Sequence, residues 1–221
     1  MSQIEMKRIG AFARLDFYTI KPYLKSFYLM IVILVLFFLF LRSVSILAAM
    51  AMVSLVTISS YPFTIGEKNN MDILYSTLSL KRKDVVIGRY VFMLFIEIAG
   101  MSLIFLLSLV MQYFFKTTYE MMEVFITLCI LLAISLSVAA IQYPIYFKIG
   151  YTKAKFMAML PLFMIFGLII ISPFFIQNME TVIEMADSNI MLIGGIAVLL
   201  GFVFLAISCW VSCKLYQKRD L

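Results

Sequence analysis

Long apolar stretches alternate along this chain with short polar segments, most of them basic. Six apolar stretches stand out, at residues 27–41, 44–65, 90–115, 124–147, 156–176 and 190–213. Most reach the roughly 20 residues that an α-helix needs to cross the hydrocarbon core of a bilayer. The pattern predicts an all-α, polytopic membrane protein with six transmembrane helices. A composition that is 64% hydrophobic and only 14% charged agrees, and it excludes a water-soluble domain.

The basic residues predict the orientation of these spans. With six spans, both termini lie on one face of the membrane. Short loops rich in Lys and Arg stay cytoplasmic, so we predict that both termini are cytoplasmic. The net charge of +6 is then a topology signal and not the footprint of a nucleic-acid partner. Of the 18 basic residues, only Arg42 and Lys116 fall on the other face; the rest are Lys7, Arg8, Arg14, Lys21, Lys25, Lys68, Lys81, Arg82, Lys83, Arg89, Lys148, Lys153, Lys155, Lys214, Lys218 and Arg219.

The N-terminal segment, residues 1–26, has the pattern of an amphipathic helix. Its apolar residues recur every three or four positions, and basic residues fall mainly elsewhere on the helical wheel. This is typical of an interfacial helix in the headgroup layer, and Pro22 is expected to break it before the first span. A plain basic topology anchor is the alternative. The apolar positions are Ile9, Phe12, Ala13, Phe17, Ile20 and Leu24. Residues 27–213 would form the transmembrane domain and 214–221 a basic cytoplasmic tail.

Several kinds of chemistry are missing from the sequence. The chain has no histidine, which excludes Ser-His and Cys-His nucleophilic pairs and histidine-ligated metals. Its three cysteines, Cys129, Cys209 and Cys213, lie in apolar spans and are expected to be core residues, so no metal site is predicted. No phosphate-binding loop of the G-x-x-x-x-G-K-[ST] type occurs. The chain is therefore not expected to be an enzyme; a conduit, a receptor or an assembly subunit remains.

The loop between the second and third spans carries a second amphipathic pattern. After a breaker at residues 66–70, apolar residues at i, i+3, i+4 and i+7 predict a short helix over about 70–80, followed by basic residues. Such a helix, parallel to the membrane, can seat in a groove of a soluble motor subunit, or it can pack on its own bundle. The residues expected to contact a motor are Met71, Asp72, Leu74, Tyr75, Leu78, Lys81 and Arg82. A smaller contact is predicted at Lys148, Tyr151 and Lys153 in the loop after the fourth span.

Glu97 is the only acidic residue placed inside a predicted span. A charge near the middle of a bilayer costs about 2.5–3.5 kcal/mol on insertion scales, so such residues usually face a polar cavity or a partner. Glu97 is therefore a candidate for lining a transport path together with Gln142. The alternative is a structural glutamate, protonated or hydrogen-bonded to Gln142, Ser102 or a neighbouring span.

Two blocks of the sequence resemble the ABC-2 type permeases. The first contains Tyr61-Pro62-Phe63, Glu67-Lys68, Met71-Asp72-Ile73-Leu74 and Ser79-Leu80-Lys81-Arg82-Lys83. The second is residues 144–155, PIYFKIGYTKAK, and is similar to a small bacterial branch that includes the exporters of phenol-soluble modulin peptides. The resemblance covers essentially the whole chain in length and topology.

The resemblance implies a permease subunit in the bacterial cell membrane. Such a subunit pairs with a second permease, identical or homologous, and with two separately encoded ATPase subunits. The ATPases bind ATP and Mg²⁺, so no cofactor is expected on this chain, and the loop after the second span would carry the coupling helix. The expected activity is export of a hydrophobic or amphipathic substrate such as a peptide, drug or lipid-like molecule. The alternatives are the substrate-binding subunit of an energy-coupling-factor importer and a proton-coupled carrier using Glu97.

Overall fold

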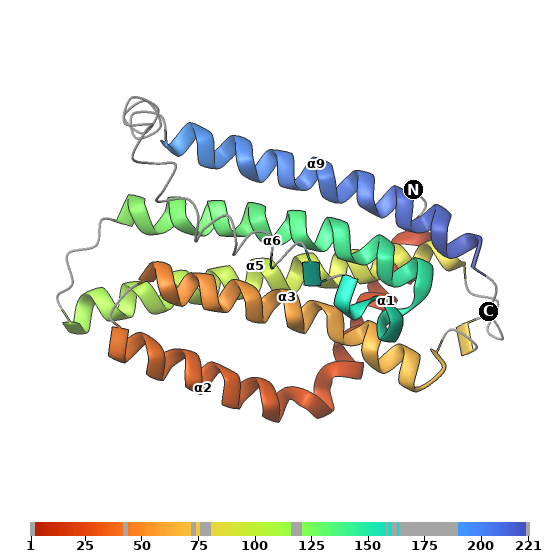
Figure 1. Ribbon diagram of the computed structural model, residues 1–221, viewed down its shortest axis with the longest axis horizontal. Helices are drawn as coiled ribbons and strands as arrows, with labels where there is room; N and C mark the ends of the chain where they lie inside the picture. Colours follow the sequence, from red (N-terminus) through yellow and green to blue (C-terminus); the bar gives the residue numbers. More distant parts are fainter. Residues whose placement is uncertain are drawn as a thin grey trace.

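The computed structural model describes residues 3–41, 44–71, 74–75, 81–115, 121–157, 159–160, 163 and 190–219. These residues form a bundle of helices that run along one long axis (Figure 1). Its members are α2 (Leu24–Leu41), α3 (Val44–Lys68), α5 (Arg82–Phe115), α6 (Met121–Ile149) and α9 (Ile190–Gln217). They are preceded by α1 (Gln3–Ile20) and a short 3-10 turn, η1 (Lys21–Tyr23). No strand occurs in the described part, and the all-α prediction is confirmed.

Four of these helices contain a segment long and apolar enough to cross a membrane, counting only the described residues. The segments are Leu47–Lys68, Arg82–Phe114, Val124–Ile149 and Met191–Gln217, and they coincide with the second, third, fourth and sixth predicted spans. Large apolar side chains cover their outer faces, as lipid-facing surfaces require; Phe95, for example, is 62% exposed. The chain is thus a multi-pass membrane protein. The predicted fifth span, 156–176, lies mostly outside the described residues, and six crossings stay a prediction.

Two helices extend beyond the apolar stretches that revealed them. The third span was predicted to begin at Tyr90, but α5 begins at Arg82. Its first turn is closed by the Lys81 carbonyl, which accepts from the Asp84 and Val85 N–H groups at 2.9 and 3.4 Å. Likewise α9 continues past Cys213 to Gln217. Hydropathy marks the part of a helix that contacts lipid, whereas the helix itself can continue into water through charged turns.

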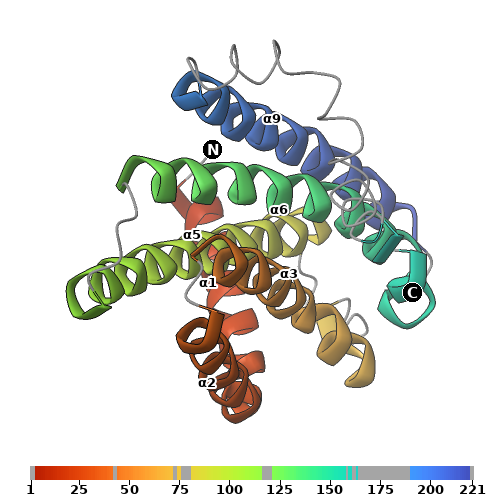
Figure 2. The ribbon, with the colours of Figure 1, turned by 60° about the vertical axis from the view of Figure 1, so that its left-hand side comes forward.

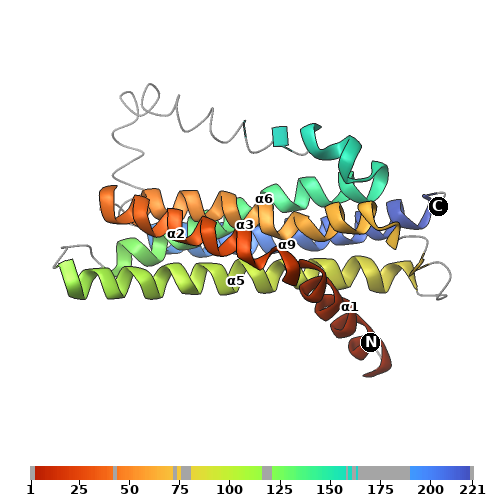
Figure 3. The ribbon, with the colours of Figure 1, turned by 90° about the horizontal axis from the view of Figure 1, so that it is seen from below.

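The predicted N-terminal helix is present as α1, and Pro22 lies in the 3-10 turn that separates it from α2. Its apolar stripe, however, is largely buried by protein. Ile9, Phe12 and Ile20 are each no more than 8% exposed, and α1 packs mainly against α5 (Figure 3). The contact is close because α5 has a glycine there: a Cβ at Gly88 would lie 2.5 Å from the Phe12 Cβ.

The core has a different character in the two halves of the bundle. One half is aliphatic, with residues such as Leu55, Met101 and Ile104 between α3 and α5. The other half is rich in aromatic rings, among them Phe63 and Tyr143, whose centroids lie 4.9 Å apart. The aromatic half lies where α1 and the C-terminal parts of α3, α6 and α9 pack on the N-terminal part of α5. Figure 2 shows the ends of α6 and α9 beside the start of α5.

Candidate functional site

The two loops that were predicted to contact a motor subunit lie together at this end of the bundle. We call it the basic end and define it by Glu67, Arg82, Gly150 and Arg219. Figure 1 shows that the described ends of α1 and α9 also lie there. Each loop is tied to other helices by side chains that sequence reasoning did not assign.

Glu67 joins the last turn of α3 to the segment after α6. Its Oε2 accepts a hydrogen bond from the backbone N–H of Thr152 at 2.9 Å. Gly150 ends α6 with a left-handed φ of +83°, and its carbonyl accepts from the Ala154 N–H at 3.1 Å, which opens a new helical turn. The Glu67 carboxylate therefore caps the start of the helix at 151–157, a position that favours negative charge.

Gly150 also brings α9 into this contact. A Cβ at Gly150 would lie 3.2 Å from Glu67 Oε1 and 3.3 Å from Arg219 Nη2. Both charged side chains therefore lie close to the glycine backbone, where a Cβ would crowd them. Movement of the loop at 148–155 would displace the ends of α3 and α9 as well.

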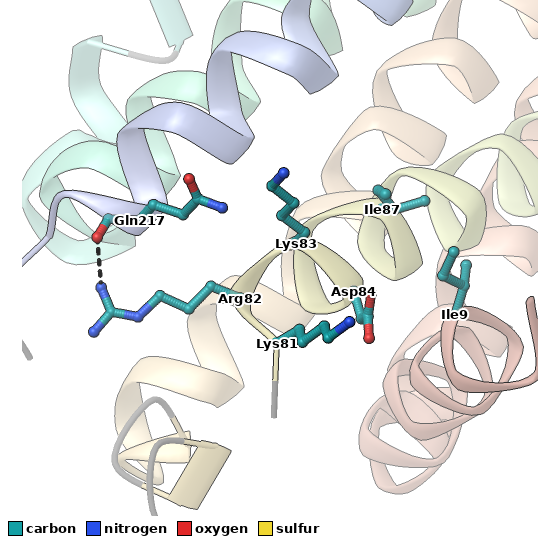
Figure 4. A pocket seen from close by; sticks show the side chains of 7 residues that line it. All are labelled: Ile9, Lys81, Arg82, Lys83, Asp84, Ile87 and Gln217. Carbon is teal, nitrogen blue, oxygen red and sulfur yellow. Dashed lines mark hydrogen bonds between the residues drawn. The ribbon is translucent and has the colours of Figure 1, made fainter. Parts of the chain in front are cut away.

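Arg82 ties the start of α5 to the end of α9. Its Nη1 donates to the backbone carbonyls of Tyr216 and Arg219 at 3.0 and 2.7 Å, and to that of Gln217 at 3.1 Å, the bond drawn in Figure 4. The last carbonyls of a helix have no intrahelical donor, and they carry the negative end of the helix dipole. One guanidinium therefore caps α9 from another helix. Arg82, which we predicted to contact a motor, has a structural role within the chain.

Arg89 lies buried among aromatic rings about two turns beyond Arg82 in α5. Its guanidinium carbon is 4.4 Å from the Phe63 ring centroid and 5.7 Å from that of Phe147, within the range of cation–π attraction. A Cβ at Gly66 would lie 2.9 Å from Arg89 Nη2, so the guanidinium also occupies the space beside α3. Arg89 thus contacts α3 and α6 simultaneously.

Asp16 of α1 faces this arginine. The Asp16 Oδ2 to Arg89 Nε distance is 3.9 Å, and both side chains are nearly fully buried. Burial raises the pKa of Asp16 to about 6, because desolvation outweighs the attraction to Arg89 at this long distance. The sequence held a signal for this residue, since position 16 falls on the same helix face as Ile9, Phe12 and Ile20. An acid on an apolar face needs a buried partner.

The predicted contact residues after α3 divide between the surface and the core. Leu74 is 46% exposed, and its N–H donates to the Asn70 carbonyl at 3.4 Å, which closes a helical turn. Tyr75 is buried, with its ring 5.6 Å from the Phe12 ring in an edge-to-face arrangement. Met71 is half-buried against the same core. Asp72 and Leu78 lie outside the described residues. The exposed Leu74 thus supports contact with a motor subunit, and the buried Tyr75 supports packing on the chain's own bundle.

The remaining predicted contacts lie at the surface of the basic end. Lys81, Lys148 and Lys153 are exposed. Tyr151 is half-buried, and its ring stacks on Tyr146 with centroids 5.1 Å apart. Among the predicted contact residues that the structure describes, Leu74 and these lysines are therefore the exposed ones.

Glu97 and Gln142 lie inside the bundle. Glu97 is 0% exposed, and neither carboxylate oxygen has a hydrogen-bond partner among the described residues. Gln142 is 3% exposed. Both side chains point into packed protein in the single chain, and their place on a transport path stays a prediction.

Comparison with known proteins identifies a family. The family model described as "ABC-2 family transporter protein" matches residues 13–217, which is nearly the whole chain. No curated protein and no solved structure matches the chain.

Proposed function

We propose that this chain, which belongs to the ABC-2 family of transporter proteins, is the membrane-spanning subunit of an ABC exporter. It would work in the bacterial cell membrane with a second permease, identical or homologous, and with two ATPase subunits that bind ATP and Mg²⁺. The basic end would face the cytoplasm, as the distribution of Lys and Arg favours. The substrate would be hydrophobic or amphipathic.

The observation that carries the proposal is the linkage between helices beside an exposed apolar residue. Leu74 projects from the loop after α3, and an apolar side chain on a polar surface is suited to a groove in a soluble partner. The same end of the bundle holds the Glu67–Thr152 and Arg82–α9 hydrogen bonds. A push delivered near Leu74 would therefore reach the ends of α3, α5, α6 and α9 together.

An apolar groove in the other half of the bundle supports a hydrophobic or amphipathic substrate. About 100 Å³ of space lies between α2, α3 and α5, lined by residues such as Leu34, Leu55 and Ile104. Among the described residues that line it, Ser54 has the one polar side chain. This volume is too small for a whole drug-sized molecule, but it can accept an apolar side chain or a stretch of acyl chain.

Affinity purification from native membranes tests the proposal. The wild-type chain should recover a protein that carries a phosphate-binding loop and hydrolyses ATP. Leu74→Glu places a charge in the docking contact and should abolish that recovery. Tyr113→Glu is the matched control, because Tyr113 is 83% exposed near the opposite end of α5. Recovery of the ATPase that is unaffected by Leu74→Glu, or no ATPase with the wild type, would count against the proposal.

A further inference from the structure

A cavity of about 500 Å³ opens at the basic end between α1, the start of α5 and the end of α9 (Figure 4). Seven residues line it, and they are Ile9, Lys81, Arg82, Lys83, Asp84, Ile87 and Gln217. Three consecutive basic residues thus contribute to its lining, with Arg82 extending toward Gln217, Lys81 toward Asp84 and Lys83 away from Asp84 in Figure 4. We propose that this cavity binds the headgroup of an anionic phospholipid of the inner leaflet, with the phosphate held by Lys81 and Lys83.

The charges of the cavity favour an anion. The Nη1 of Arg82 already donates to carbonyls at the end of α9, whereas Lys81, which directly precedes α5, and Lys83, in its first turn, are both exposed. Asp84 also lines the cavity, on the side toward Ile9 in Figure 4, and it offsets one of the three positive charges. The net charge of the side chains that line the cavity is still positive. The start of a long helix adds a further positive potential from the backbone dipole.

The cavity is basic at the end away from the membrane and apolar at the end toward it, as a phospholipid ligand requires. Lys81 and Lys83 stand at the tip of α5, and Ile87 follows one turn nearer the membrane. Beyond Ile87 an exposed apolar stripe continues along the same face of α5, through Val91, Phe95 and Ile98. A small free anion would use only the basic tip. A phospholipid would use both parts, with its headgroup at the lysines and an acyl chain along the stripe.

The placement of the cavity agrees with the level of the headgroups. One wall is α1, which leaves the bundle axis at an angle (Figure 3), and the other is the end of a membrane-spanning helix. Lys214 Nζ lies 3.5 Å from the centroid of the Trp210 ring on the face of α9 that carries Gln217. Tryptophan and lysine at the end of a span are typical of the membrane–water interface. Basic pockets between helices on this side of a membrane suit anionic headgroups.

Trp210 supplies the probe, because it is the only tryptophan in the chain and is 61% exposed. It lies about 10 Å along α9 from Gln217. The full chain would be reconstituted in phosphatidylcholine vesicles that contain increasing fractions of phosphatidylglycerol brominated on its acyl chains. We expect Trp210 fluorescence to be quenched at lower mole fractions of brominated phosphatidylglycerol than of brominated phosphatidylcholine. Equal quenching by the two lipids would overturn the proposal.

Variants of Lys81 and Lys83 test whether the preference for phosphatidylglycerol arises at the cavity. Each of Lys81→Gln and Lys83→Gln should lower the relative affinity for phosphatidylglycerol by roughly fivefold, whereas the Lys→Arg exchanges should retain it. Lys148→Gln with Lys153→Gln is the control, since it removes two exposed charges of the same end outside the cavity. An equal loss in this control would mean that general surface potential attracts the lipid, and the proposal would be wrong.

Two further outcomes separate the other possible occupants. Inorganic phosphate at millimolar concentration should not relieve the quenching; if it does, the site holds small anions and not a lipid. The Lys83→Gln variant should still recover the ATPase in affinity purification, because Lys83 lines the cavity but is not one of the predicted motor contacts. Lost ATPase recovery with an unchanged lipid preference would assign Lys83 to the motor and overturn the lipid site.

Discussion

Gly88 offers a sharp test of how α1 is held on the bundle. A Cβ at this position would lie 2.5 Å from the Phe12 Cβ, 3.3 Å from the Ile9 carbonyl oxygen and 3.5 Å from the Ala13 nitrogen. Carbon atoms in contact prefer about 3.5–4.0 Å. Since the Phe12 Cβ and the α1 backbone cannot rotate away, Gly88→Ala must push α1 outward by about 1 Å.

The expected magnitude follows from two opposing effects. Overpacking at a close contact costs about 1–3 kcal/mol. Alanine in place of glycine inside a helix adds about 1 kcal/mol to the free energy of unfolding through its higher helix propensity. The net result for Gly88→Ala is a loss of about 1 kcal/mol, and the melting temperature should fall by about 2–4 °C for each kcal/mol lost.

The assay is thermal unfolding of the purified chain in detergent, with Gly10→Ala as the matched control. Gly10 also lies in α1, but a Cβ there would have nothing within 4 Å. The control should therefore melt at or above the wild-type temperature, because it gains helix propensity without a clash. If Gly88→Ala melts like Gly10→Ala, α1 does not cross α5 at Gly88 as the structure shows.

Three further perturbations test the links at the basic end. Arg82→Gln removes the guanidinium that caps α9, so we expect a loss of about 1–3 kcal/mol and faster hydrogen exchange in the last turn of α9, whereas Lys155→Gln should change neither. The pKa of Asp16 is about 6 in the folded protein against an ordinary 3.8, so the folded state binds the proton more tightly. Stability should therefore fall by on the order of 3 kcal/mol as the pH rises from about 4 to above 6, and melting of Asp16→Asn should lack this slope. Gly150→Ala forces a φ of +83° on a residue with a Cβ, and melting should report a loss of about 1–3 kcal/mol. An unchanged melting temperature would show that this turn relaxes without strain.

The periodicity of the sequence predicted the elements well. The 3.6-residue pattern indicated α1, and the fixed φ of Pro22 indicated its end. Both are local properties that depend on residues a few positions apart. The same applies to the long apolar helices, although their charged first and last turns were missed because hydropathy does not register them.

The pairings that hold the basic end could not be predicted in the same way. Arg82 caps carbonyls more than 130 positions along the chain, and Glu67 meets Thr152 across a separation of 85. Periodicity assigns a face to each residue, but it does not say which two faces meet. The apolar stripe of α1 shows this limit, because the same pattern suits a lipid surface or a protein groove. In the structure it packs on α5.

The central claim is that the basic end docks an ATPase, and position-specific cross-linking in intact cells tests it most directly. A photoreactive amino acid would replace Leu74 at the basic end or Tyr113 near the other end of α5, both of which are exposed. The account predicts that position 74 cross-links to a protein with a phosphate-binding loop and that position 113 does not. A cross-link to that ATPase from position 113, or none from position 74 while the ATPase still co-purifies with the chain, would contradict it.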